Sequence, residues 1–226
     1  MKNLSFFFVL LLAVLAVSEL RAQNTCTNPS PDYLFCPEGH SMVTAATGIP
    51  YIGIAEYAYG ISDKTTIGLV YGQTPVVTGY GARVRSIISE PSERVRIYFR
   101  APLFYYPQTH DLGGEPWFLT WPVVNVEYTR DCGRRMWAGI GAVGAVCAHS
   151  LARTLGLEHS TEMMGEGFHG GLWNTVQVGG TQPITSNLVA QVEFGVVMNG
   201  LKVAKPDDWV GGPPVILTMG LTYQLQ

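Results

Sequence analysis

The strongest constraint on the fold is an alternation of apolar and polar residues in the stretch VILTMGLTYQLQ, at residues 215–226. Successive side chains of a β-strand point to opposite faces, so a period of two sustained over 12 residues predicts one long two-faced strand. One face carries Val215, Leu217, Met219, Leu221, Tyr223 and Leu225, and the other carries Ile216, Thr218, Gly220, Thr222, Gln224 and Gln226.

Residues 1–22 have the parts of a secretory signal peptide. Lys2 supplies the positive charge, a core of 14 mainly apolar residues follows, and Ala22 is a small residue suited to cleavage. A membrane-spanning helix needs about 20 apolar residues, and Ser18 and Glu19 interrupt this run before that length is reached. The sequence therefore predicts an exported chain that meets a membrane, if at all, with strands.

The charge of the mature chain argues against one class of partner. Without the signal peptide the chain carries 12 basic and 16 acidic residues. Proteins that bind nucleic acid are usually basic, so we expect no nucleic-acid partner.

The rest of the mature chain is a series of segments with the same period of two. The clearest is the hairpin AEYAYGISDKTTIGLVYG, where residues 62–65 form the turn and each limb has one apolar face. A second hairpin turns at 131–134, and weaker strands are expected at SMVTAATG and LWNTVQV. The sequence predicts an all-β fold of antiparallel strands, with further long strands near residues 79–88, 94–103, 135–146, 187–198 and 214–226.

Two architectures fit this alternation. A secreted, soluble β-sandwich that acts as a binding module would bury the apolar face, whereas a transmembrane barrel turns that face to lipid and the polar face to its lumen. The longer segments approach the 9–11 residues that cross a bilayer, and aromatic residues gather towards strand ends, as in the girdles of membrane barrels. Short links near 62–65, 89–93, 131–134 and 179–186 alternate with long links near 104–117, 148–171 and 199–213.

These features favour the barrel. The predicted fold class is a closed antiparallel transmembrane β-barrel of eight to ten strands, and ten are preferred because both weak strands are needed to keep the long links on one side. The predicted organisation is a signal peptide at 1–22, an N-terminal periplasmic segment at 23–40 and a barrel domain at 41–226.

The C-terminal stretch also resembles the terminal insertion signal of bacterial outer-membrane β-barrel proteins. The residues that match the pattern are Thr218, Gly220, Tyr223 and Leu225, and the hairpin YAYGISDKTTIGLVYG is similar to hairpins of small channel-like, porin-like barrels. The resemblance implies localisation in the cell outer membrane. It also implies two partners, the barrel-insertion machinery and outer-membrane lipid.

Arginines form the most distinctive side-chain cluster. They lie on the polar face of two adjacent predicted strands, where like charges repel one another unless nearby acidic groups compensate them. The predicted lumen-lining residues are Arg83, Arg85, Arg94, Arg96 and Arg100, with Glu56, Glu127 and Glu193 on polar faces of the same parity. Such a lumen fits either an ion-paired plug in a structural membrane protein or a narrow pore for small anionic solutes.

Other candidate chemistry is weaker. An outer-membrane lipid-modifying enzyme would need a serine with a histidine base, and His149-Ser150 and His159-Ser160 in link 148–171 contain both. Adjacent strand residues point to opposite faces, so a His-Ser dipeptide does not by itself form a dyad. We therefore predict no catalytic residues, no metal site and no cofactor.

The four cysteines fit an oxidising compartment. Cys26 and Cys36 enclose nine residues and are the candidates for a local disulfide. If residues 135–146 form one strand, Cys132 and Cys147 lie about 45–50 Å apart, far beyond the roughly 7 Å that a disulfide allows between Cα atoms.

Overall fold

A computed structural model describes residues 34–49, 52–74, 78–107, 116–130, 133–147, 170–199, 202–203 and 215–225. Its elements are β1 (Ser41–Ile49), β2 (Gly53–Ser62), β3 (Thr65–Gln73), β4 (Thr78–Ser92), β5 (Val95–Tyr106), β6 (Trp117–Thr120), β7 (Val123–Thr129), β8 (Arg135–Cys147), β9 (Gly170–Pro183), β10 (Leu188–Asn199), β11 (Lys202–Val203) and β12 (Val215–Leu225). Among these residues, no helix has the length and apolarity to cross a membrane.

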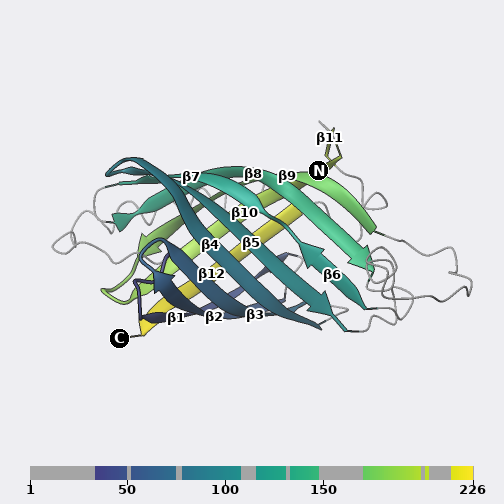
Figure 1. Ribbon diagram of the computed structural model, residues 1–226, viewed down its shortest axis with the longest axis horizontal. Coiled ribbons are helices and arrows are strands. Elements are labelled where there is room, and N and C mark those ends of the chain that lie inside the picture. Colours follow the sequence, from purple (N-terminus) through teal and green to yellow (C-terminus); the bar gives the residue numbers. More distant parts are fainter. Residues whose placement is uncertain are drawn as a thin grey trace, which may run out of the picture.

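The strands close into an antiparallel barrel of ten strands. The first and last strands complete the ring, since β1 pairs with β12 from Ser41↔Leu225 to Ile49↔Leu217. Figure 1 shows the yellow β12 running obliquely between β1 and β10. Short strands β6 and β7 lie end to end between β5 and β8 and count as one barrel strand, while the two-residue β11 pairs with the end of β10.

This closure confirms the predicted fold class and excludes the β-sandwich. Both weak strands are full members of the barrel: SMVTAATG lies in β1, and LWNTVQV lies in β9. The Gly- and Ala-rich segment that follows the 131–134 turn is extended over all of β8, paired with β7 on one side and β9 on the other. Ten strands are therefore confirmed over eight.

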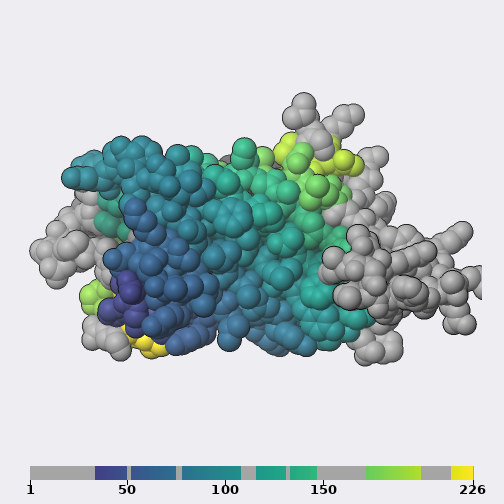
Figure 2. All heavy atoms as spheres, viewed as in Figure 1, coloured from purple at the N-terminus to yellow at the C-terminus, as the bar shows by residue number. Residues whose placement is uncertain are grey.

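The alternation sorts side chains between the two faces of the wall. On β3, Ile67, Leu69 and Tyr71 are exposed while Thr66 and Val70 are buried. The exposed large side chains are thus largely apolar, which is the opposite of a soluble protein and the arrangement that lipid requires. Figure 2 shows the continuous outer wall that β2 to β5 form in this view, in blue and teal.

Two hairpin turns differ from the sequence prediction. β4 continues to Ser92, beyond the start of the turn expected at 89–93, with register shifts between Ile87 and Ser89 and between Ser89 and Ser92. Such bulges let a strand accommodate a residue such as Pro91, which has no N–H to donate. Similarly, β9 continues to Pro183, so the link expected at 179–186 is reduced to residues 184–187.

Two apolar layers fill the ends of the interior. At the end where the long links lie, one cluster contains Val70, Phe104, Tyr106, Trp117, Trp121, Val123, Val143, Ala145, Trp173, Val197 and Ile216. At the end of the short turns, a smaller cluster contains Leu34, Phe35, Tyr98 and Trp137. The polar layer described below lies between them.

The turn-end cluster depends on a glycine beside Trp137. Gly179 faces Trp137 across the β8–β9 pair, and a Cβ atom on Gly179 would lie 2.4 Å from the indole ring. Because the buried ring is rigid, we expect Gly179→Ala to lower the free energy of unfolding by about 1–3 kcal/mol. Urea unfolding of the refolded barrel in detergent measures this loss.

Gly53→Ala is the matched control, because a Cβ atom on Gly53 meets nothing within 4 Å. Equal losses in the two variants would contradict the close packing at Trp137.

Candidate functional site

The centre of the barrel interior holds a network of buried ion pairs. Glu56 on β2 accepts hydrogen bonds through Oε2 from Arg83 Nη1 at 2.6 Å and Arg85 Nη2 at 2.7 Å. The three side chains are 1 %, 13 % and 7 % exposed, respectively. Arg83 and Arg85 are alternate residues of β4 and point to the same face, so one carboxylate can pair with both arginines.

A second pair joins this centre from the far side of the ring. Arg100 on β5 binds Glu193 on β10 with both terminal nitrogens, Nη1 to Oε2 at 2.6 Å and Nη2 to Oε1 at 2.8 Å. Arg100 Nη2 also donates to Gln177 Oε1, and Gln177 Nε2 donates to Asn125 Oδ1. The charged layer therefore bridges strands that are far apart in the wall.

A third group lies nearer the short turns. Glu127 on β7 accepts hydrogen bonds from Arg96 Nε at 3.0 Å and from Arg135 Nη1 at 2.8 Å. The Arg96 guanidinium also lies over the Phe35 ring, 5.1 Å from its centroid. This contact ties the charged layer to the turn-end apolar cluster.

The structure brings together seven of the eight residues that the sequence proposes for the lumen: Arg83, Arg85, Arg96, Arg100, Glu56, Glu127 and Glu193. Arg94 is the exception, because it lies in the turn between β4 and β5 and is exposed. It was assigned to the lumen because the turn was expected to end at residue 93, which would have placed Arg94 in the following strand.

Sequence reasoning missed three polar members of the layer, which are Arg135, Asn125 and Gln177. Arg135 is the first residue of the strand expected at 135–146 but was not assigned to the lumen; it begins β8 and is buried. Arg135 and Trp137 are alternate residues of one strand and therefore point to the same face, and both are buried. This shared face was the signal that could have placed Arg135 in the barrel interior.

The N-terminal segment enters the turn end of the barrel. Leu34, Phe35 and Cys36 are buried, and Phe35 packs edge-on against Tyr98 with 5.4 Å between ring centroids. The Cys36 amide donates to Thr66 Oγ1, while Glu38 pairs with Gly60 on β2. Part of the segment expected at 23–40 therefore packs inside the barrel. Its proposed disulfide remains a prediction, since Cys26 lies outside the described residues.

The proposed insertion-signal residues all lie on β12 and divide between its faces. Tyr223 and Leu225 are exposed on the outer wall, whereas Thr218 and Gly220 are partly buried on the opposite face. Gly220 packs closely, since a Cβ atom there would lie 2.6 Å from the Ala46 Cβ.

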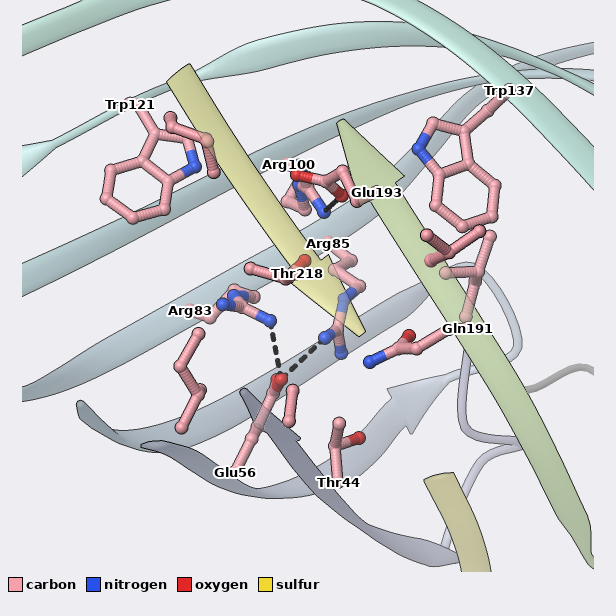
Figure 3. A pocket seen from close by; sticks show the side chains of 15 residues that line it. Thr44, Glu56, Arg83, Arg85, Arg100, Trp121, Trp137, Gln191, Glu193 and Thr218 are labelled. Atoms are coloured by element: carbon pink, nitrogen blue, oxygen red, sulfur yellow. Dashed lines mark hydrogen bonds and ion pairs between the residues drawn. The ribbon is translucent and has the colours of Figure 1, made fainter. Parts of the chain in front are cut away.

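A small cavity opens beside the first two ion-pair groups. Its volume is about 50 Å³. Figure 3 shows Glu56 reaching toward Arg83 and Arg85, with Trp121 and Trp137 on opposite sides. The lining also includes Thr44, Gln191 and Thr218. Apolar residues of both end clusters thus meet the charged layer at this cavity.

Other functional groups lie elsewhere. Within the described ranges, no cluster of three or more His, Cys, Asp and Glu could hold a metal ion. The serines and histidines considered for a lipid-modifying enzyme fall in residues 148–169, outside the described part of the chain.

Comparison with known proteins gives likeness in structure alone. No protein-family model and no curated protein sequence matches the chain. The N-terminal β-barrel domain of Pseudomonas aeruginosa OprF is 11 % identical, with a TM-score of 0.32, over 82 % of this chain and 96 % of that one. The outer membrane protein OprG of the same organism is 9 % identical, with a TM-score of 0.34, over 86 % and 100 % of the two chains. Ail of Yersinia pestis is 10 % identical, with a TM-score of 0.21, over 82 % and 94 %.

The ion pairs predict a sharp penalty for removing a single acidic group. Glu56→Gln would leave Arg83 and Arg85 side by side, buried, without their shared counter-charge. Breaking one partner of a buried pair costs about 3–5 kcal/mol, so we expect a loss of that size in the free energy of unfolding.

The matched control is Glu90→Gln, because Glu90 pairs with Lys64 at 3.7 Å on the exposed surface. Exposed pairs contribute about 0–1 kcal/mol. A double variant, Glu56→Gln with Arg85→Met, should recover part of the loss, because it removes one of the uncompensated charges. Similar losses in the Glu56 and Glu90 variants would contradict a role for the buried network.

Proposed function

We propose that the chain is a bacterial outer-membrane β-barrel with a closed lumen, serving as a structural membrane protein and not as an open diffusion pore. The observation that carries this proposal is the inversion of polarity across the wall: apolar side chains are exposed on the outside while the arginine and glutamate network is buried inside. A closed ring of this polarity is suited to lipid, because its backbone groups are paired and no strand edge is left open.

Aromatic residues on the outer wall support the membrane setting. At the end of the long links, Tyr71, Tyr80, Tyr105 and Phe118 face one another directly across four successive strands. At the end of the short turns, Tyr59, Tyr128 and Tyr223 are exposed on β2, β7 and β12. Two aromatic bands on either side of an apolar zone are typical of transmembrane barrels.

The contents of the interior support a closed lumen. The ionic layer lies between two apolar layers, and the cavity beside it measures about 50 Å³. Small barrels have interiors just wide enough for side chains, so this filling supports a lumen that is closed to hydrated solutes.

One observation favours a second candidate, a narrow pore selective for small anions. The residues that line the cavity include three arginines and two glutamates, so the wall has an excess of positive charge. When the lumen is open, such a positively charged wall favours the passage of anions over cations.

Conductance in a planar bilayer separates these two candidates. We expect folded, heat-modifiable wild-type barrel to insert without producing steady current steps, since the layers of side chains obstruct the lumen. Long-lived anion-selective steps at low voltage would contradict the closed lumen and support the pore.

The same proposal makes the barrel-insertion machinery a partner, and Tyr223 tests this. Tyr223 is 46 % exposed on the outer wall, so its loss should affect recognition during assembly more than the packing of the folded barrel. We expect Tyr223→Ser to lower the amount of heat-modifiable barrel in the outer membrane of cells while leaving refolding in detergent unchanged.

Tyr128→Ser is the control, because Tyr128 is 43 % exposed on a strand far from the C-terminus. An equal assembly defect in both variants would count against a C-terminal signal.

A further inference from the structure

We propose that the cavity beside Glu56 binds one small monovalent anion of the halide type. The site uses the barrel interior alone, so the proposal holds whether or not the lumen ever opens and wherever the barrel resides. Three features of the cavity lead to it: its charge, its surplus of donors and its size.

The charge of the lining is unbalanced. Arg83 and Arg85 share the single carboxylate of Glu56, and Arg100 pairs with Glu193. The cavity lining therefore contains three guanidinium groups against two carboxylates. The arginine side chains are 13 %, 7 % and 9 % exposed. An uncompensated charge in such a setting is strongly unfavourable, and one bound monovalent anion would neutralise it.

The hydrogen-bond donors of the lining arginines also indicate an anion. Within the described residues, Arg85 Nε and Nη1, Arg83 Nε and Arg100 Nε are buried and have no hydrogen-bond acceptor, whereas Glu56 Oε1 is the one buried carboxylate oxygen of this group without a donor. Guanidinium groups donate and cannot accept. A surplus of donors on the arginines that line the cavity fits an anion and disfavours a cation.

The volume is compatible with a small anion. A cavity of about 50 Å³ has room for a water molecule or an ion of similar size, such as a halide. In Figure 3 the guanidinium groups of Arg83 and Arg85 face the space between Glu56, Gln191 and Thr218.

Urea unfolding of the refolded barrel tests the site, with sodium bromide compared against sodium gluconate at constant ionic strength. Gluconate is a much larger anion than bromide, so it serves as the reference for general salt effects. We expect bromide to stabilise the wild type in a saturable way. At ten times the dissociation constant, the ratio of folded to unfolded protein should rise about elevenfold.

Arg85→Met removes the charge excess together with two of the donors that lack acceptors, so the bromide effect should disappear. Arg94→Met is the matched control, because Arg94 is exposed in the β4–β5 turn and its loss changes the net charge equally; this variant should keep the wild-type response. An absent bromide effect in the wild type, or an equal effect in the Arg85 variant, would overturn the proposal.

Anomalous diffraction from wild-type crystals soaked in sodium bromide provides a test that requires no variant to fold. A bromide peak within hydrogen-bond distance of Arg85 would support the site, and a cavity without a peak would overturn it.

Discussion

The pairing of β1 with β12 is the constraint on which the rest of the structure depends. A strand edge exposed to lipid would leave backbone N–H and C=O groups without partners, which the hydrocarbon region does not tolerate. Nine residue pairs from Ser41↔Leu225 to Ile49↔Leu217 remove that edge. Closure then fixes which side chains face inward, because the alternation along every strand leaves one face for lipid and one for a narrow interior.

That interior explains why the arginines come with glutamates. A charged side chain inside the barrel is not solvated as it would be on the surface. The free-energy cost of this desolvation must be offset by an oppositely charged side chain on another strand. Glu56, Glu127 and Glu193 each meet arginines from other strands, and Arg100 alone links β5 to β10 and β9. Some of these pairs also connect strands that are not neighbours in the wall, which the backbone ladder does not do. The apolar layers at the two ends then keep water away from the pairs, which strengthens their electrostatic attraction.

The sequence predicted those parts of the fold that depend on alternation. Parity along the chain placed Arg83, Arg85 and Glu56 on polar, inward faces, because side-chain direction in a strand repeats with a period of two. The alternation of short and long links identified SMVTAATG as a strand, because it requires a strand before residue 52. Parity could not give the position of a turn, since bulges in β4 shift the register and leave Arg94 outside the strands. Parity also could not show that Phe35 enters the barrel, because the segment that contains Phe35 does not alternate. Its position depends on the space inside the closed barrel, which exists only once all the strands are paired.

The most direct test of the account is the accessibility of spin labels along β3 in lipid vesicles, in a variant whose native cysteines are replaced. Labels at residues 67, 69 and 71 should collide readily with dissolved oxygen, which concentrates in the bilayer, whereas labels at 66, 68 and 70 should be shielded both from oxygen and from a water-soluble nickel complex. An alternation of this kind is what an apolar outer wall around a filled interior predicts. Equal oxygen accessibility at both sets of positions, or strong collision of the nickel complex with the inward set, would contradict it.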